Sequence, residues 1–199
     1  MRQVAMGAQN DSGRDSAGPT WRLVALPVLL ACVVGTFSLD GDFVFDDRFA
    51  LLESPVVQGQ VGLGEALSRD FWGQPLAGGD KVSWRPLLPM LWRAVWAGSD
   101  GAALAFRSLS MILHVIATAL ATVLLVRLLP SAGLAVLAGG LFAVHPAHSE
   151  AIGGIVAQAD VFATACGLGA LLLVLGEGFG PGGRRAPSAS ARPLATPLA

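Results

Sequence analysis

Residues 102–129 read AALAFRSLSMILHVIATALATVLLVRLL. This run is almost entirely apolar, and its only permanently charged residues are Arg107 and Arg127. An α-helix of about 20 apolar residues crosses the ~30 Å hydrocarbon core of a bilayer. The run ends at Pro130 and Ser131, residues that favour a turn. Residues 102–129 are therefore predicted to form a transmembrane helix.

Three further apolar runs, at 23–39, 132–148 and 160–176, carry the same signal but lie near the lower length limit for a span. Charged residues make up 14% of the chain, well below the roughly 25% of soluble domains. We therefore expect an all-α integral membrane protein with about four transmembrane helices. A secretory signal peptide is the alternative for 23–39, but this run is long for one and lacks a small-x-small cleavage site.

The membrane domain is predicted to occupy 21–176, between two polar tails. Residues 1–20 are rich in Gly, Ser, Asp and Asn, and residues 177–199 in Gly, Pro, Ser and Arg. Neither composition can bury an apolar core, so both tails are expected to be disordered.

The segment 40–101 differs from the apolar runs and is predicted to be a large loop outside the bilayer. It holds nine of the 14 acidic residues and four of the five tryptophans. Tryptophan favours the membrane–water interface. Within the loop, 86–96 is expected to form a short interfacial helix with an apolar face.

Basic residues in the short flanks predict the orientation. They precede the first run, lie between the second and third, and follow the fourth: Arg2, Arg14, Arg22, Arg127, Arg184, Arg185 and Arg192. With four spans all of them fall on one side, which the positive-inside rule makes cytoplasmic. Both termini would then be cytoplasmic, in a bacterial inner membrane or an ER-type membrane. The loop 40–101 and the segment 145–160 would face the periplasm or lumen.

The sequence Asp40-Gly-Asp-Phe-Val-Phe-Asp-Asp-Arg48 directly follows the first run. Paired carboxylates such as Asp46 and Asp47 suit a general base or a metal ligand, and Arg48 would favour their ionised form. The alternative is a solvated start of a loop, where Asp is common.

The second polar segment is His145-Pro-Ala-His-Ser-Glu150, with Asp160 further along. His145, His148, Glu150 and Asp160 could hold a divalent cation or hydrogen-bond a sugar or phosphate. The spacing matches no zinc signature. Equally, the segment could be a polar cap between two helices, in which Pro146 ends one and Ser149 caps the next.

Two arginines and a histidine stand out near the outer membrane face. Arg107 and His114 are seven residues apart and share one helix face, which is expected to line a bundle interior or a wet cavity. Arg85, in Ser83-Trp-Arg-Pro-Leu87, could bind a lipid phosphate. The alternatives are an interfacial anchor for Arg85 and a helix–helix hydrogen bond for His114.

Four motifs together resemble a known family: Asp42-Phe-Val-Phe-Asp-Asp-Arg-Phe-Ala50, Ser83-Trp-Arg-Pro-Leu87, Leu141-Phe-Ala-Val-His-Pro-Ala-His-Ser-Glu-Ala151 and Gln158-Ala-Asp160. The series resembles the N-terminal membrane portion of the transmembrane-and-tetratricopeptide-repeat proteins, an O-mannosyltransferase-like branch of the GT-C glycosyltransferases. The resemblance covers about 24–175. It implies transfer of a sugar from a polyprenyl-phosphate carrier to a hydroxyl of an acceptor protein or glycan, on the outer or lumenal side.

The resemblance also implies roles for individual residues. Asp47, slightly preferred to Asp46, would be the general base, and would converge with His148 and Glu150 on one outward cavity. Arg85 and Arg107 would neutralise the departing lipid phosphate. No cofactor is implied with certainty, because only some GT-C relatives bind a divalent metal, here at Asp47, His148 and Glu150.

Members of this family carry more spans and a soluble repeat array, which this sequence lacks. The enzyme interpretation therefore competes with that of a truncated, non-catalytic accessory or binding subunit. A small transporter is less favoured, because no inverted repeat is visible. The net charge of −1 gives no reason to expect a nucleic-acid partner.

Overall fold

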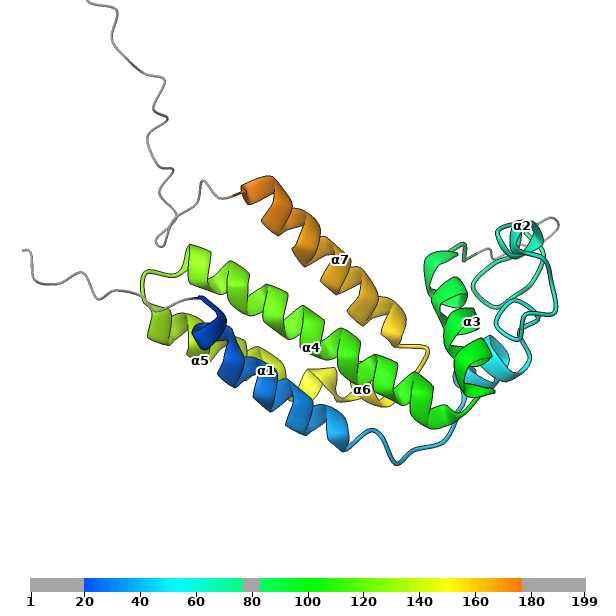
Figure 1. The fold of residues 1–199 in the computed structure, drawn as a ribbon, viewed down its shortest axis with the longest axis horizontal. Coiled ribbons are helices and arrows are strands. Elements are labelled where there is room, and N and C mark those ends of the chain that lie inside the picture. Colours follow the sequence, from blue (N-terminus) through cyan, green and yellow to red (C-terminus); the bar gives the residue numbers. More distant parts are fainter. Residues whose placement is uncertain (1–19, 77–82, 177–199) are drawn as a thin grey trace, which may run out of the picture.

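The computed structural model describes residues 20–76 and 83–176. In this part of the chain, long helices lie side by side and a lobe of shorter elements sits at one end of them (Figure 1). The predicted all-α class is confirmed for the described residues. The predicted disordered tails lie outside these residues, apart from Thr20, which begins the first helix.

The long helices coincide closely with the apolar runs of the sequence. They are α1 (Thr20–Thr36), α4 (Ala103–Leu128), α5 (Ala132–Val144) and α7 (Gln158–Leu175). The first helix begins and ends three residues earlier than predicted, because residues 37–40 form a turn. Helix α4 packs against α1, α5 and α7, and α1 also packs against α5.

Glycines allow the helix axes of α1, α4 and α5 to approach closely. A Cβ atom at Gly35 of α1 would collide with the side chain of Met111 on α4. Likewise, a Cβ at Gly139 of α5 would collide with the hydroxyl of Thr122 on α4. Small residues at such crossings are typical of helices that associate within a membrane.

The predicted third span, 132–148, is not one straight helix. Helix α5 ends at Val144, and a short 3-10 turn (Pro146–His148) and α6 (Ser149–Gly153) continue at an angle of 42°. Pro146 is the cause, because its ring has no N–H to continue the hydrogen-bond ladder of α5. Ala147 instead donates its N–H to Nδ1 of His145. His145 thus caps the 3-10 turn, in line with a polar cap between two helices, whereas Ser149, the predicted cap, is the first residue of α6.

Two of the described helices, α4 and α7, are long and apolar enough to cross a membrane, and α5 with its bent continuation would make a third. Helix α1 is apolar but has only 17 residues. Side chains such as Val33 of α1, Leu137 of α5 and Val174 of α7 are exposed, as expected for a surface that faces lipid. The chain thus has the helices of a membrane protein, although this count is lower than the predicted four spans.

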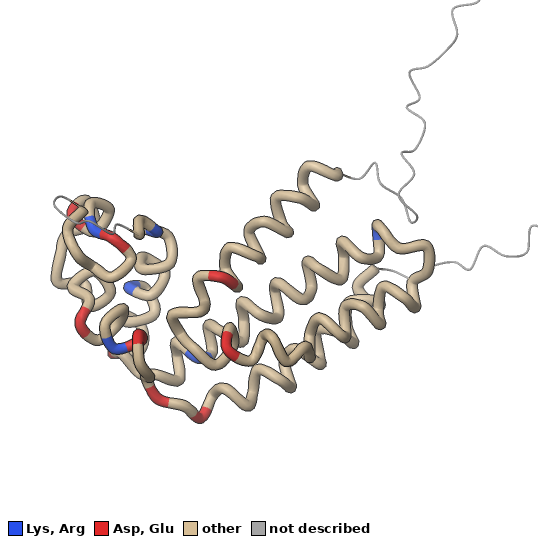
Figure 2. The backbone as a smooth tube through the Cα atoms, turned by 180° about the vertical axis from the view of Figure 1, so that it is seen from behind, with Lys and Arg blue, Asp and Glu red and all other residues tan. Residues whose placement is uncertain are grey.

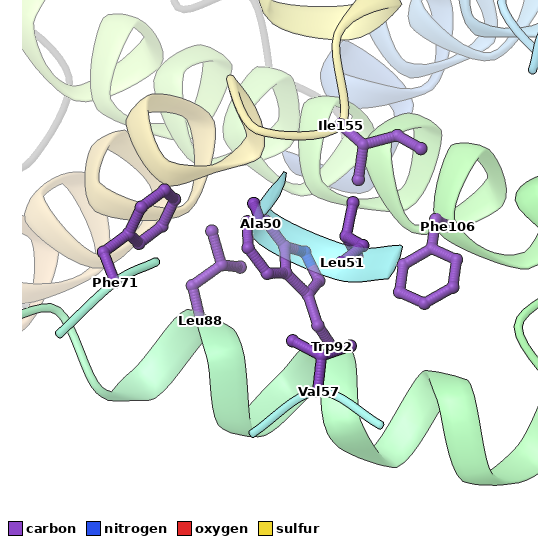
Figure 3. Close-up of a cluster of buried hydrophobic side chains, with 8 residues drawn as sticks. All are labelled: Ala50, Leu51, Val57, Phe71, Leu88, Trp92, Phe106 and Ile155. Carbon is purple, nitrogen blue, oxygen red and sulfur yellow. The ribbon is translucent and has the colours of Figure 1, made fainter. Parts of the chain in front are cut away.

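The described parts of the loop, 40–76 and 83–101, fold as the lobe, which contains η1 (Arg48–Leu52), α2 (Leu63–Ala66) and α3 (Leu87–Ser99). Helix α3 stands where 86–96 was predicted to be helical. The lobe has a core of its own, whose side chains meet in Figure 3: Ala50, Leu51, Val57, Phe71, Leu88, Trp92, Phe106 and Ile155. Phe106 belongs to α4 and Ile155 precedes α7, so this core also fixes the lobe onto the helices.

Charged residues are gathered in the lobe and at the adjacent ends of the helices (Figure 2). The helical region beyond this end is nearly free of them, and Arg127 lies at its far end. The guanidinium of Arg127 donates hydrogen bonds to the carbonyls of Leu172 and Gly176, at 3.3 and 3.0 Å. The charged side chains that could bind a polar substrate or transfer protons therefore lie at the lobe end, next to an apolar helix bundle.

Candidate active site

A cavity of about 530 Å³ lies where the lobe meets the ends of α6 and α7. Its walls come from two segments, Val44–Asp47 on the lobe side and Glu150–Asp160 on the helix side, together with Arg85. We call it the junction cavity. Five residues singled out from the sequence line it: Asp46, Asp47, Arg85, Glu150 and Asp160.

Asp47 is only 2% exposed, and both of its carboxylate oxygens are engaged. The backbone N–H of Val156 donates to one oxygen at 2.9 Å, and the N–H of Val44 donates to the other at 3.2 Å. The carboxylate thereby ties the lobe wall of the cavity to the helix wall. These contacts give Asp47 a structural task that the sequence did not reveal.

The neighbouring Asp46 is exposed and lines the same cavity. The residue before it, Phe45, has a φ of 44°, a left-handed conformation that is uncommon for a bulky side chain. This conformation turns the chain sharply just before the two carboxylates. Asp47 is buried beneath the cavity, while Asp46 stays accessible.

Within residues 20–76 and 83–176, Arg85 is the only basic residue that lines the junction cavity. Its guanidinium carbon lies 5.7 Å from the ring centroid of Phe71, a distance typical of a cation–π contact. The other charged lining residues are four carboxylates, so the cavity is predominantly acidic. An anionic group could be held only on the side of Arg85.

Arg107 does not line the junction cavity but a separate one of about 360 Å³, together with residues such as Ser38 and Gly153. It is 5% exposed, and it donates to the carbonyls of Ser38 and Gly153, both at 3.0 Å, and to that of Asp42. Three separate parts of the chain are thus joined by one guanidinium. These bonds use both N–H groups of Nη1 and one of Nη2, whereas Nε has no partner among the described residues, so the phosphate role of Arg107 stays a prediction.

His148 also lies apart from the junction cavity. It lines a smaller cavity of about 230 Å³ between α4, α5 and α7, together with His114, Phe142 and Asp160. The His148 ring lies 5.6 Å from the His114 ring and 4.6 Å from the Phe142 ring, and Nε2 of His114 is 3.0 Å from the Ala143 carbonyl. Asp160 lines both cavities, so His148 lies near the junction cavity without forming its wall.

The predicted metal set of Asp47, His148 and Glu150 is not assembled. Among the described residues, no group of three or more His, Cys, Asp or Glu side chains is placed to hold a metal ion. Asp47 is engaged by backbone N–H groups, which further separates it from such a role.

Gln158 is a residue whose role the sequence analysis missed. Its side chain is fully buried, accepts a hydrogen bond from the indole of Trp92 at 2.8 Å, and donates to Phe106 O and Ser110 Oγ, each at 2.7 Å. It connects α3, α4 and α7 beside the junction cavity. The sequence did hold one sign of this role: Gln158 is a polar amide at the start of an apolar run, two residues from Asp160.

Comparison with known proteins supports the resemblance seen in the sequence. The chain is 40% identical over 144 residues to protein O-mannosyl-transferase Tmtc1 of Drosophila melanogaster, covering 72% of this chain and 17% of that protein. It is 40% identical to Tmtc2 of the same organism over 69% of this chain and 15% of the relative. Human protein O-mannosyl-transferase TMTC4 is 34% identical over 79% of this chain and 23% of its own length.

The chain therefore spans about a sixth to a quarter of the length of these relatives. No family profile matches the chain, and no solved structure matches it either. The similarity covers 69–79% of this chain, and every relative named above is a protein O-mannosyl-transferase. Over about 70% of its length, the chain is thus a homologue of the TMTC protein O-mannosyl-transferases.

Proposed function

We propose that this chain is part of a membrane glycosyltransferase that moves mannose from a polyprenyl-phosphate carrier to a hydroxyl of an acceptor protein. The observation that carries the proposal is the junction cavity, which gathers four carboxylates and one arginine at the polar end of an apolar helix bundle. Such a place can admit a lipid-borne donor from the bilayer and a polar acceptor from water. The names of the relatives supply the sugar and the protein acceptor.

Within this cavity, Asp46 is the better candidate for the general base. A base must approach the acceptor hydroxyl within about 3 Å. Asp46 is exposed and lines the cavity, whereas Asp47 is buried with both oxygens engaged by backbone N–H groups. We therefore propose Asp46 as the base, in place of the Asp47 slightly preferred from the sequence. Asp47 would instead position the segment that carries Asp46.

Arg85 is proposed to hold the phosphate of the departing carrier. It is the one cation that lines the cavity in the part of the chain that the structure describes, and a guanidinium can bind two phosphate oxygens at once. The surrounding carboxylates would otherwise repel the phosphate. Glu150 and Asp160, both exposed, remain available to hydrogen-bond sugar hydroxyls.

We further propose four membrane crossings, with α1 as the first and α5 with α6 as a bent third. At 1.5 Å per residue, the 17 residues of α1 extend about 25 Å, which is close to the ~30 Å core. Figure 1 supports this topology, because the start of α1, the α4–α5 turn and the end of α7 lie at the end opposite the lobe. The lobe would then lie on the outer or lumenal side.

The test is transfer of radiolabelled mannose from polyprenyl-phosphate mannose to an acceptor protein, in membranes that contain the full chain. Asp46→Asn should lower transfer by about 10²-fold or more, the usual contribution of a general base. Asp42→Asn is the matched control, because Asp42 is exposed and does not line the cavity.

Wild-type transfer that survives Asp46→Asn would refute the role of Asp46. If wild-type membranes show no transfer above empty membranes, the catalytic proposal fails. The non-catalytic binding subunit would then be favoured, in keeping with the small share of its relatives that the chain spans.

A further inference from the structure

A second cavity, of about 370 Å³, lies in the lobe and is lined by Phe49, Glu53, Trp72 and Gln74. We call it the aromatic pocket. It shares no lining residue with the junction cavity. The two are nevertheless close, because Asp47 lines one and Phe49 the other, and Cα atoms two residues apart are separated by at most about 7.6 Å.

The wall that carries Trp72 and Gln74 is held in place by Asp70. This carboxylate is 8% exposed, and one of its oxygens accepts hydrogen bonds from the backbone N–H groups of Trp72 and Gln74, at 3.0 and 2.8 Å. The Trp72 ring also meets Phe71 edge-on, with centroids 5.1 Å apart. One buried carboxylate thus fixes the backbone of two lining residues at once.

The two walls are also fixed against each other. Gly73, between Trp72 and Gln74, has a φ of +80°, and a Cβ at this position would come within 2.8 Å of Ser54 Oγ. Ser54 is fully buried and follows Glu53 directly. The turn 70–74 therefore packs tightly on the segment that presents Glu53, and the pocket is built before any ligand binds.

The chemistry of the lining fits a neutral sugar. The C–H faces of a pyranose can stack on the faces of Phe49 and Trp72, since polarised C–H groups are attracted to the negative face of an aromatic ring. A Glu carboxylate accepts hydrogen bonds from hydroxyls, and a Gln amide both donates and accepts them. Among the residues that the structure describes, no cation lines the pocket, so these residues offer no positively charged partner for a phosphate or another anion.

We propose that the aromatic pocket binds a pyranose unit of the mannosylated acceptor, beside the cavity where transfer takes place. Its assignment to acceptor or product rests on the proposed function, whereas sugar binding itself does not. The proximity of the two cavities would let an acceptor chain extend from one to the other.

The experiment is saturation-transfer NMR with methyl α-D-mannopyranoside and the purified full chain in detergent micelles. Ring C–H protons of the mannoside should show the strongest transfer. Trp72→Ala should weaken binding about tenfold or more, as the loss of roughly 1.4 kcal/mol requires. Because Trp72 also packs on Phe71, Gln74→Leu and Glu53→Gln give a second pair of variants that leave the aromatic packing intact.

Two controls separate this proposal from the proposed function. Trp21→Ala removes another exposed tryptophan, far from the lobe at the start of α1, and should leave mannoside binding unchanged. Asp46→Asn, which strongly lowers transfer under the proposed function, should also retain binding. If the chain binds the mannoside in a Trp72-dependent way but shows no transferase activity, sugar binding by the aromatic pocket is supported. Only the proposed enzymatic function is then refuted.

No saturation transfer at tens of millimolar mannoside would overturn the proposal, as would binding that is indifferent to Trp72, Glu53 and Gln74. A third decisive result is binding of tetramethylammonium in place of the mannoside, lost in Trp72→Ala. The rings and Glu53 would then form a cation site.

Discussion

The buried amide of Gln158 offers a quantitative test of how the lobe is held on the helices. Replacement by Leu roughly preserves the volume but removes all three side-chain hydrogen bonds. The main cost is the indole N–H of the fully buried Trp92, which is left without its acceptor. A buried donor without a partner costs about 1–3 kcal/mol, and the two weaker losses add roughly 0.5 kcal/mol each. We expect Gln158→Leu to lower the free energy of unfolding by about 2–4 kcal/mol.

The assay is pulse proteolysis of the full chain in mixed micelles with a rising fraction of SDS, which reports the folded population. Trp92→Phe removes the same donor, so the double variant should be less destabilised than the sum of the two single variants by about 1–2 kcal/mol. Gln60→Leu is the matched control, because Gln60 is exposed, and it should change stability by less than about 0.5 kcal/mol. Strict additivity, or a Gln158→Leu variant as stable as the wild type, would refute this account.

Three further predictions test other parts of the structure. In Gly41→Ala, the new methyl group would collide with the Arg107 guanidinium, which should lower stability by about 1–3 kcal/mol in the same assay. Gly62→Ala is the control, because its methyl group meets open space. Equal stability of the two variants would contradict the packing of Gly41 on Arg107. Phe45→Asn should raise the free energy of unfolding by roughly 0.5 kcal/mol or more, because Asn tolerates the left-handed φ of 44° and Phe45 is 88% exposed, so little packing is lost. Phe45→Leu is the control and should not raise stability. A gain in stability with Leu would count against backbone strain at this position. In a Cys32→Ser background, Cys166 of α7 should react with a membrane-impermeant maleimide only after the membranes are dissolved in SDS. As a control, a cysteine added by Gly62→Cys in the lobe should react in sealed membranes whose outer or lumenal side faces the reagent. Labelling of Cys166 in intact membranes would argue against α7 as a span.

The helices could be predicted because their signal is local. An apolar run of sufficient length defines a membrane helix whatever surrounds it, so the bounds of α4 and α7 agree with the prediction to within two residues. A break at Pro146 was one of the two alternatives for 145–150, because proline cannot continue a helix. The 42° bend that follows depends on how α6 packs, and no pattern in the sequence contains it.

The partners of the polar residues could not be predicted, because they come from distant parts of the chain. The N–H of Val156 that binds Asp47 is 109 residues away, and the carbonyls that Arg107 contacts are 46 to 69 residues away. A sequence motif identifies a residue type that suits chemistry. It does not reveal whether backbone groups already occupy that side chain, as they do for Asp47 and Arg107.

This difference between occupied and accessible side chains divides the site into a frame and a reactive surface. Asp47 joins Val44 to Val156, and Arg107 joins the carbonyls that flank the same two walls, so both are buried parts of the frame. Asp46, Glu150 and Asp160 are exposed on the cavity that this frame encloses. Substitutions in the frame should therefore lower stability first and activity as a consequence. Substitutions on the exposed carboxylates should lower activity at unchanged stability, because a folded frame does not require their charge.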